Sequence, residues 1–327
     1  MRAIVIENPG PESVARIAEM SEPTCARGEV LIAVRAAGVN RADLLQRAGK
    51  YPPPAGISEL LGLEVAGVIE GLGEGVTTFA LGDRVCALLA GGGYSEKVSV
   101  PAVQVMPIPN GLSFEEGAAL PEAFITAFVN LFVEGGLTKG ERVLIHGGSS
   151  GVGTAAIQLA REAGALVACS VGDEKKAERC RELGALLAIN YRNEDFLESA
   201  RKWAPDGVDL ILDIVGKEYL EKNLELLAPH GRLVQIATMS GADARIDLRI
   251  LMSKRLRLIG SVLRSRSVSE KGALVTEFSA RYSKLFSEGA LKAVIDSTYT
   301  FDQVEEAHKR MRSSAHVGKL VLRWAST

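Results

Sequence analysis

A glycine-rich turn near the middle of the chain carries the clearest chemical signal. Residues 142–146 (RVLIH) are typical of a buried strand, residues 147–153 (GGSSGVG) form the turn, and residues 154–163 continue as an apolar-periodic helix. Glycine lets backbone N–H groups approach a ligand closely, and a helix N-terminus offers unpaired donors with a partial positive charge. The segment therefore predicts a cradle for a pyrophosphate.

The turn matches the dinucleotide fingerprint G-x-G-x-x-G imperfectly, because Ser150 stands where the middle glycine is usual, between Gly148 and Gly153. A glycine-rich turn before a helix can also be no more than a tight connection. The following segments decide between the two. Short apolar strands are expected at 166–170, 186–190, 208–214 and 231–237, and helices at 174–183, 193–202 and 218–227. This alternation predicts a parallel, doubly wound sheet, and hence a Rossmann domain.

The residues after the second strand indicate which nicotinamide cofactor binds. NAD enzymes place an Asp or Glu about 20 residues past the first glycine, where the carboxylate binds the ribose 2′-OH. Residues 168–172 (ACSVG) contain no acid, whereas Lys175, Lys176, Tyr191 and Arg192 follow nearby. The absence of an acidic residue and the presence of nearby hydrogen-bond donors favour a 2′-phosphate, so the sequence predicts NADPH.

Two observations leave this preference open. Lys175 and Lys176 are equally compatible with a solvated helix face. Asp173 lies in the same loop and would oppose a phosphate if its side chain pointed toward it.

Length and composition limit the class of protein. A chain of 327 residues exceeds one ordinary domain, which predicts two. The net charge of −2, with 24% charged residues, argues against nucleic acid or an anionic membrane as the main partner. The N-terminus is typical of a short strand broken by Pro9 rather than a signal peptide, and no apolar run is long enough to span a bilayer. We expect a cytoplasmic location.

Neither the cysteines nor the histidines show metal-ligand spacing. The cysteines, which contain no C-x-x-C pair, are Cys25, Cys86, Cys169 and Cys180. The histidines are His146, His230, His308 and His316. We expect all four cysteines to be structural and no metal to be bound.

The first 120 residues have a different texture. Strands are expected at 29–39, 63–70 and 83–88, separated by glycine-rich turns, which is typical of an all-β domain or partly opened barrel. A strand at 319–324 follows a helix at 302–313. The Rossmann pattern ends near a strand at 257–262, so the last strand is predicted to return to the first domain.

The whole pattern resembles the medium-chain dehydrogenase/reductase superfamily, and within it the zinc-free quinone oxidoreductases of the zeta-crystallin type, on the stress-inducible branch. The segments that carry the resemblance are 37–43 (AGVNRAD), 49–52 (GKYP), 61–67 (LGLEVAG), 121–127 (PEAFITA), the phosphate loop and 263–266 (LRSR). The resemblance implies an α/β protein with a GroES-like, partly open β-barrel catalytic domain and a Rossmann domain. The expected boundaries are 1–122 (catalytic), 123–265 (NADPH-binding) and 266–327 (return to the catalytic domain).

The departures from the zinc alcohol dehydrogenases are equally informative. Those enzymes have a Cys ligand near the position of Asn40 and a Gly-His-Glu motif where this chain has Gly62-Leu63-Glu64. The lobe with four closely spaced cysteines is missing too, and residues 90–94 (AGGGY) are glycine-rich instead. Removing a hydride from an alcohol without a Lewis acid is difficult, so the chain is expected to be a zinc-free reductase.

The resemblance implies a substrate cleft between the two domains, with the catalytic side of the site formed by Asn40, Gln46 and Tyr51. Asn40 could instead be a turn-forming residue that ends a strand. Tyr51 could instead pack on the proline-rich segment 52–54. Residues 91–93 could leave room for a flat ring or form a plain hairpin turn.

The cofactor residues are likewise implied by the resemblance. Thr126 is expected at the nicotinamide, and Gly148, Ser150, Gly151 and Val152 at the pyrophosphate. The 2′-phosphate is expected beside Gly172, Lys176 and Tyr191. Later strand ends contribute Gly216, Thr238 and Met239, and the nicotinamide end is completed by Leu263, Arg264 and Ser265. Asp213, at a strand end, could be a satisfied helix cap.

These expectations converge on NADPH-dependent reduction of a quinone, or another electron-poor carbonyl acceptor, without zinc. The alternative is an enone or 2-enoyl thioester double-bond reductase in which Tyr51 donates the proton. A purely structural or binding role is a third reading, and the charge balance gives it no support. The resemblance also implies a homodimer formed through the edge strand at 256–262.

Overall fold

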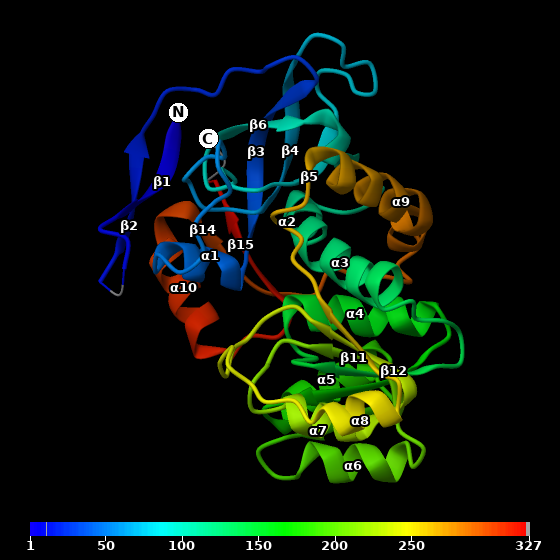
Figure 1. The fold of residues 1–327 in the computed structure, drawn as a ribbon. Coiled ribbons are helices and arrows are strands. Elements are labelled where there is room, and N and C mark those ends of the chain that lie inside the picture. Colours follow the sequence, from blue (N-terminus) through cyan, green and yellow to red (C-terminus); the bar gives the residue numbers. More distant parts are fainter. Residues whose placement is uncertain (11, 325–327) are drawn as a thin grey trace. The chain divides into compact units, whose positions relative to one another are not determined.

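The computed structural model describes residues 1–10 and 12–324 and divides the chain into two compact units (Figure 1). One unit contains Met1–Ile125 together with Leu263–Thr327, and the other contains Thr126–Val262. The first division falls inside α3 (Pro121–Phe128). The domain boundaries expected from the sequence were at 122/123 and 265/266.

The second unit is built on a six-stranded sheet. Its strands are β8 (Arg142–His146), β9 (Leu166–Val171), β10 (Leu187–Asn190), β11 (Val208–Asp213), β12 (Leu227–Gln235) and β13 (Arg257–Gly260). All neighbours pair in parallel, in the order β10-β9-β8-β11-β12-β13. The predicted doubly wound Rossmann domain is confirmed.

Helices connect these strands. They are η2, a π-helix (Val129–Glu134), α4 (Gly151–Glu162), α5 (Glu174–Leu183), α6 (Phe196–Trp203), α7 (Leu220–Leu226) and α8 (Leu248–Ser253). The chain moves outward from β8 to β10 and then crosses to β11 on the other side of β8. The strand order therefore reverses between β8 and β11, where doubly wound sheets bind ligands at the carboxyl ends of their strands.

Capping side chains determine where α4 and α5 begin. The hydroxyl of Ser150 accepts a hydrogen bond from the Gly153 N–H at 3.0 Å, so α4 begins at Gly151, earlier than the expected 154. Asp173 caps α5 in the same way through the N–H of Lys176, also at 3.0 Å. Each helix therefore begins directly after a turn that the sequence assigned to the cofactor.

The first unit contains a seven-stranded sheet and a separate two-stranded ladder. The ladder is β1 (Arg2–Glu7) with β2 (Val14–Glu19). The sheet contains β3 (Glu29–Val39), β4 (Glu64–Leu72), β5 (Arg84–Leu88), β6 (Lys97–Pro101), β7 (Val105–Pro107), β14 (Ile295–Thr300) and β15 (Lys319–Arg323). The strand order is β14-β15-β3-β4-β5-β7, with β6 on β3. The predicted GroES-like β-domain is confirmed.

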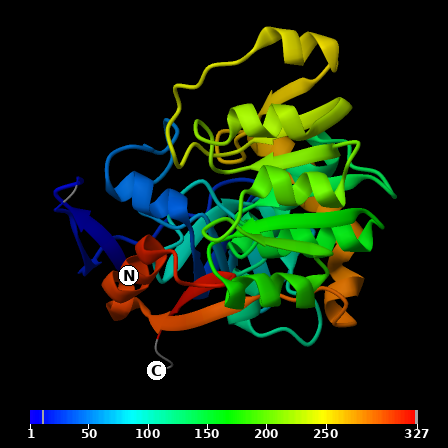
Figure 2. The same ribbon diagram turned by 90° about the horizontal axis from the view of Figure 1, so that it is seen from below.

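The C-terminal strand closes this sheet. β15 pairs antiparallel with β3, with Leu320 opposite Val39, so the red end of the chain lies against its blue beginning in Figures 1 and 2. The sequence predicted that this strand returns to the first domain, and in the structure it belongs to the same unit as β3. Trp324, directly after β15, stacks on Phe301 with ring centroids 4.0 Å apart.

Short helices and one long helix complete the first unit. They are α1 (Arg41–Arg47), η1 (Ala102–Gln104), α2 (Phe114–Ala118), the first part of α3, α9 (Val268–Ser287), η3 (Phe301–Gln303) and α10 (Val304–Ser313). The long helix α9, which the sequence analysis did not anticipate, packs on η1. A Cβ at Gly272 would lie 2.8 Å from the Cβ of Val103, so the glycine permits this close packing.

Candidate cofactor and acceptor sites

The phosphate turn has room only for glycine at two of its positions. A Cβ at Gly153 would lie 2.2 Å from the carbonyl oxygen of Gly147, and one at Gly148 would lie 2.7 Å from the Cβ of Cys169. The first N–H groups of α4, at Gly151 and Val152, have no partner within the helix. A narrow glycine-rich turn that leads into open backbone N–H donors fits a pyrophosphate.

A network of hydrogen bonds between buried side chains lies next to the turn. His146, at the end of β8, lies 2.8 Å from the Ser170 hydroxyl and 2.8 Å from the side-chain oxygen of Asn223. Asn223 in turn donates to Asp213. Burial lowers the pKa of His146, so the ring stays neutral at neutral pH. In the sequence this histidine looks isolated, and nothing there indicates the hydrogen-bond network.

Asp213 has a structural role, although not that of a helix cap, since the N-cap of α7 is Tyr219. Its carboxylate accepts hydrogen bonds from the N–H groups of Val215 at 2.6 Å and Gly216 at 3.2 Å. It therefore shapes the turn after β11 rather than facing a ligand.

Donor side chains gather beyond the end of β9. The hydroxyl of Tyr191 lies 2.8 Å from the position that a Cβ of Gly172 would occupy, and Nε of Arg192 lies 3.7 Å from it. Lys176 has a side chain only 12% exposed, and its Nζ lies 3.6 Å from Asp173. Asp173 therefore caps α5 and also faces Lys176. Lys175 is exposed.

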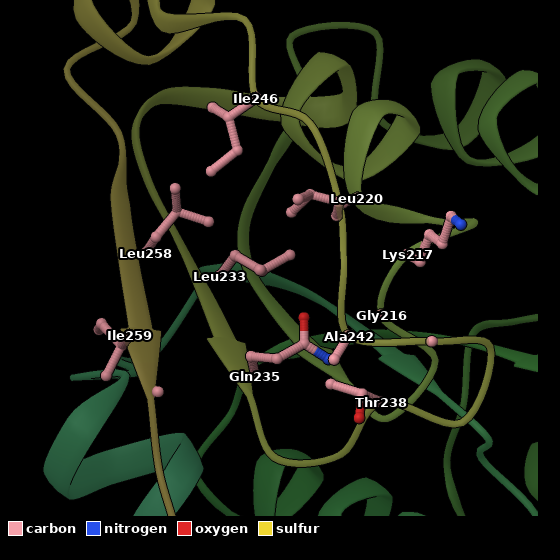
Figure 3. A pocket seen from close by; sticks show the side chains of 13 residues that line it. Gly216, Lys217, Leu220, Leu233, Gln235, Thr238, Ala242, Ile246, Leu258 and Ile259 are labelled. Atoms are coloured by element: carbon pink, nitrogen blue, oxygen red, sulfur yellow. The ribbon is translucent and has the colours of Figure 1, made fainter.

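The later strand ends surround a small pocket of about 230 Å³ (Figure 3). Leu220, Leu233 and Leu258, which come from α7, β12 and β13, are among the apolar side chains that line it (Figure 3). Two predicted cofactor residues, Gly216 and Thr238, also line it. Gly216 has a φ of 87° and a Cβ there would lie 2.9 Å from the carbonyl of Gly241. Met239, the third predicted residue of this group, is 54% exposed.

Thr126 stands just before the π-helix. Its carbonyl oxygen accepts a hydrogen bond from the side-chain amide of Asn130 at 2.7 Å. The other end of that amide, Oδ1 of Asn130, is buried without a hydrogen-bond partner among the described residues. π-helical turns are frequent at functional sites, and an orphaned acceptor beside Thr126 is consistent with a ligand there.

In the first unit, three predicted site residues meet around one guanidinium. Arg264 donates to Oε1 of Gln46 at 2.7 Å and to the carbonyl oxygen of Tyr51 at 3.2 Å, and its Cζ lies 5.1 Å from the centre of the Tyr51 ring. Gln46 also donates to the carbonyl of Glu59 at 2.8 Å. Leu263 is buried, whereas Ser265 is exposed. The structure thus joins Gln46 and Tyr51 to Arg264, which the sequence analysis had assigned to the cofactor.

Asn40 belongs to a different group of buried charges. Its Nδ2 donates to Glu64 at 3.0 Å, and its Oδ1 accepts from Nζ of Lys319 at 2.6 Å. Lys319 and Glu64 form an ion pair of 2.6 Å. The Asn40 amide therefore bridges two charged side chains, a role that its position before α1 did not reveal.

Glu122, which has no predicted role from the sequence, lies close to Glu64 and Tyr51. Its backbone N–H donates to Glu64 at 2.8 Å, but its own Oε2 is buried without a hydrogen-bond partner among the described residues. Burial, reinforced by the charge of Glu64, raises the pKa of Glu122 to about 8. Its charge also contributes to the raised pKa of Tyr51, whose main cause is burial. A protonated carboxyl group beside the predicted acceptor residues is chemically unusual.

The glycines at 91–93 permit a close approach between two backbone segments. The N–H of Gly93 donates to the carbonyl of Gly62 at 3.1 Å, and a Cβ at Gly91 would lie 2.6 Å from the carbonyl of Ser58. Gly91 also lines a larger pocket in this unit. The glycines therefore have a packing role, and two of them, Gly91 and Gly92, also line this pocket.

Two family profiles match the chain. The "alcohol dehydrogenase GroES-like domain" covers residues 26–110, and the "zinc-binding dehydrogenase" domain covers residues 183–322. The quinone oxidoreductase of Rattus norvegicus is 33% identical over 98% of this chain and 97% of its own length. The synaptic vesicle membrane protein VAT-1 homolog of Homo sapiens is 34% identical over 92% of this chain and 80% of its own length.

Solved structures agree with these matches. The Escherichia coli quinone oxidoreductase complexed with NADPH has a TM-score of 0.87 and 30% identity, covering 98% of this chain and 99% of the other. The CurK enoyl reductase also has a TM-score of 0.87 and 30% identity, covering 99% of both chains.

The chain belongs to the medium-chain dehydrogenase/reductase superfamily and has quinone oxidoreductases among its relatives. It is an NAD(P)-dependent oxidoreductase of this superfamily. None of the described helices is both long and apolar enough to cross a bilayer.

The residues at the position of the zinc site in zinc-dependent relatives do not form a metal site here. Within residues 1–10 and 12–324, no three His, Cys, Asp or Glu side chains gather so that they could hold a metal ion. At the positions that correspond to the zinc ligands, Leu63 is apolar and buried, and Asn40 bonds an ammonium group. A lysine cation paired with Glu64 at this place does not fit zinc.

Proposed function

We propose that this protein reduces quinones with NADPH and without zinc. The observation that carries the proposal is the Lys319–Glu64 ion pair beside Asn40. Through this pair, a fixed ammonium group lies at the position that corresponds to the metal site. An alcohol needs a Lewis acid before it can lose a hydride, whereas a quinone is already electron-poor. These residues therefore favour an electron-poor substrate, which the protein has to orient but does not have to polarise.

In this proposal the second unit holds the cofactor. The turn at Gly148 and Ser150 and the N–H groups of Gly151 and Val152 bind the pyrophosphate. Tyr191 and Lys176, beside Gly172, bind the 2′-phosphate, which supports NADPH rather than NADH. When bound, the nicotinamide supplies the hydride.

The remaining cofactor roles stay as the resemblance implies them. Thr126 contacts the nicotinamide, and Gly216, Thr238 and Met239 bound the cofactor at the strand ends. Leu263, Arg264 and Ser265 complete the nicotinamide end.

The first unit is proposed to hold the acceptor. Gln46 and Arg264 fix each other through a hydrogen bond of 2.7 Å, and the Arg264 guanidinium lies against the Tyr51 ring. Two planar groups in van der Waals reach of each other provide a surface for a flat acceptor ring. Asn40 orients the neighbouring charges rather than offering both ends of its amide to a substrate.

Reduction of an enone or a 2-enoyl thioester is the second candidate, favoured by the structural likeness to an enoyl reductase. That reaction needs a proton donor at the α-carbon. Burial raises the pKa of Tyr51, so its phenol is protonated at neutral pH and could donate.

The Tyr51→Phe variant separates the two candidates. Quinone reduction should fall less than threefold, because the phenol does not transfer a proton that the reaction requires. Enoyl thioester reduction, if present, should fall by about a hundredfold or more, as expected for loss of a general acid. Steady-state NADPH oxidation with each acceptor gives both values. A hundredfold loss of quinone turnover would contradict the assignment.

We also propose a homodimer and a cytoplasmic location. β13 is the edge of its sheet, and the exposed apolar residues Val262, Met252 and Leu248 lie on or near the segment that carries it. An unpaired edge beside exposed apolar side chains favours association of two copies. Light scattering coupled to gel filtration tests the dimer, and cell fractionation tests the location.

A further inference from the structure

The first unit contains a pocket of about 470 Å³ that the proposed function does not fully explain. Its volume is in the range of small-molecule sites. Among its lining residues are Ala90, Gly91, Arg264 and Lys271. Two of these are buried cations, and their partners decide what the pocket can bind.

Arg264 is buried without a counter-charge. It is 3% exposed, and its three hydrogen bonds go to neutral oxygens: the Ala90 carbonyl at 2.7 Å, Oε1 of Gln46 and the Tyr51 carbonyl. It forms no ion pair with any carboxylate in the described part of the chain. A buried guanidinium normally has a carboxylate or phosphate opposite it.

Lys271, on the first turns of α9, is in the same situation. It is 4% exposed, and its ammonium group has neither a hydrogen bond nor an ion pair with a described residue. Burial lowers the pKa of Lys271, and Arg264 lowers it further, while Glu122 raises it. Lys271 lines the pocket, and its Nζ is not among the polar atoms that are fully enclosed without a partner, so the ammonium group is open to a ligand that supplies acceptors.

The nearby carboxyl group does not neutralise these cations. Glu122 is close enough to influence the pKa of Lys271 and of Arg264, but it forms no ion pair with either. It is surrounded by Glu64, Asp43 and Lys319, and its raised pKa keeps much of it protonated near neutral pH. This corner of the pocket therefore keeps a net positive charge.

Lys97, Glu29 and Arg266 also line the pocket. Lys97 is paired with Glu22 and Glu70, each at 3.0 Å. Glu29 accepts a hydrogen bond from the Ser99 hydroxyl at 2.6 Å. Arg266 adds a further cation near Arg264 in the sequence. The N-terminus of α9 is not available for an anion, because Ser267 and Glu270 cap it reciprocally.

We infer that this pocket binds the anionic substituent of the acceptor, a carboxylate or sulfonate-type group, with Lys271 as its direct partner beside Arg264. The preferred substrates would then be acidic quinones rather than neutral ones. The inference rests on the proposed function for the reaction, but the binding of an aromatic anion can be measured without turnover.

Binding is tested first, with probes that cannot be reduced. Naphthoate and its neutral amide are titrated by calorimetry into the wild-type protein, Lys271→Gln and Lys284→Gln. Lys284 is an exposed lysine on the same helix, which makes its variant a matched control. We expect naphthoate to bind more tightly than the amide, and Lys271→Gln to weaken naphthoate by roughly ten- to a hundredfold. Equal affinity for the two probes, or equal effects of the two variants, would overturn the inference.

Turnover is tested second, with ortho-naphthoquinone and its sulfonate. The ratio of KM for the sulfonate to KM for the neutral quinone should rise at least tenfold in Lys271→Gln and stay constant in Lys284→Gln. A rise in KM for NADPH instead would assign Lys271 to a cofactor phosphate and overturn the inference. If neither quinone is reduced while naphthoate still binds through Lys271, the proposed function fails and the anion site stands.

Discussion

At the level of single residues, the proposed preference for NADPH assigns different roles to two adjacent lysines with different surroundings. Lys176 is mostly buried at the start of α5 and faces Asp173, whereas Lys175 is exposed. We expect Lys176→Gln to raise the Kd for NADPH by roughly ten- to a hundredfold, because one charge-assisted hydrogen bond is lost, and to leave the Kd for NADH within twofold. Fluorescence titration with both cofactors measures this.

Lys175→Gln is the matched control, and it should change neither affinity by more than about twofold, because solvated side chains contribute little. An equal loss for both cofactors in Lys176→Gln would mean that the lysine does not contact a 2′-phosphate.

Glu122 predicts an unusual dependence of stability on pH. Its pKa is about 8 in the folded protein and 4.5 ordinarily. Between these values the unfolded chain loses the proton and the folded chain keeps it, so the folded state loses stability as pH rises. The free energy of unfolding of Glu122→Gln should therefore equal that of the wild type near pH 4.5. At pH 8 it should be higher than that of the wild type by at least about 1 kcal/mol.

Urea unfolding of the two proteins at several pH values gives this difference. A constant difference across the range would show that Glu122 ionises normally.

The sequence predicted the residues that backbone chemistry determines better than those that depend on distant partners. Gly148 and Gly153 indicate that other atoms come close to the backbone of this turn, and the structure leaves no room for a Cβ at either position. Lys319, which bonds Asn40 from 279 positions away, gives no local signal. Glu122 and Lys271 also escaped notice, because no helix was expected at either position and charged side chains are usually solvated.

At the level of elements, the Lys319–Glu64 pair joins β15 to β4 across β3. Both side chains are almost fully buried, at 5% and 0% exposure. Lys319→Met should cost about 3–5 kcal/mol, because it leaves the Glu64 carboxylate uncompensated. The double variant Lys319→Met with Glu64→Gln should cost less than the single one, since the lone charge is removed too.

Urea unfolding of the two single variants and the double variant tests this coupling. Additive losses would show that the two groups stabilise the sheet independently.

The strands were easier to predict than the helices of the first unit. β3, β4 and β5 alternate or form short apolar runs, so their positions agree with expectation within about two residues. α9 was missed although Ser267 and Glu270 form a capping box in its sequence. Its polar residues hide the periodicity of the buried face, which includes Leu274, Phe278 and Phe286.

At the level of the whole molecule, the Rossmann segment is inserted into the sequence of the other unit. The Rossmann sheet is built from a continuous segment, and the last strand of the chain pairs with β3 in the other unit. The sequence predicted this insertion from where the alternating pattern ends. The acceptor could not be predicted as directly, because the proposed acceptor site joins segments as distant as Gln46 and Arg264.

The central claim is best tested by NADPH oxidation with four acceptors: an ortho-quinone, a para-quinone, an enone and a 2-enoyl thioester, each repeated with NADH. The account predicts turnover with the quinones, at least tenfold higher kcat/KM with NADPH than with NADH, and little reduction of the other two. Faster reduction of the enone or the thioester would contradict it and make the protein a double-bond reductase with Tyr51 as the donor.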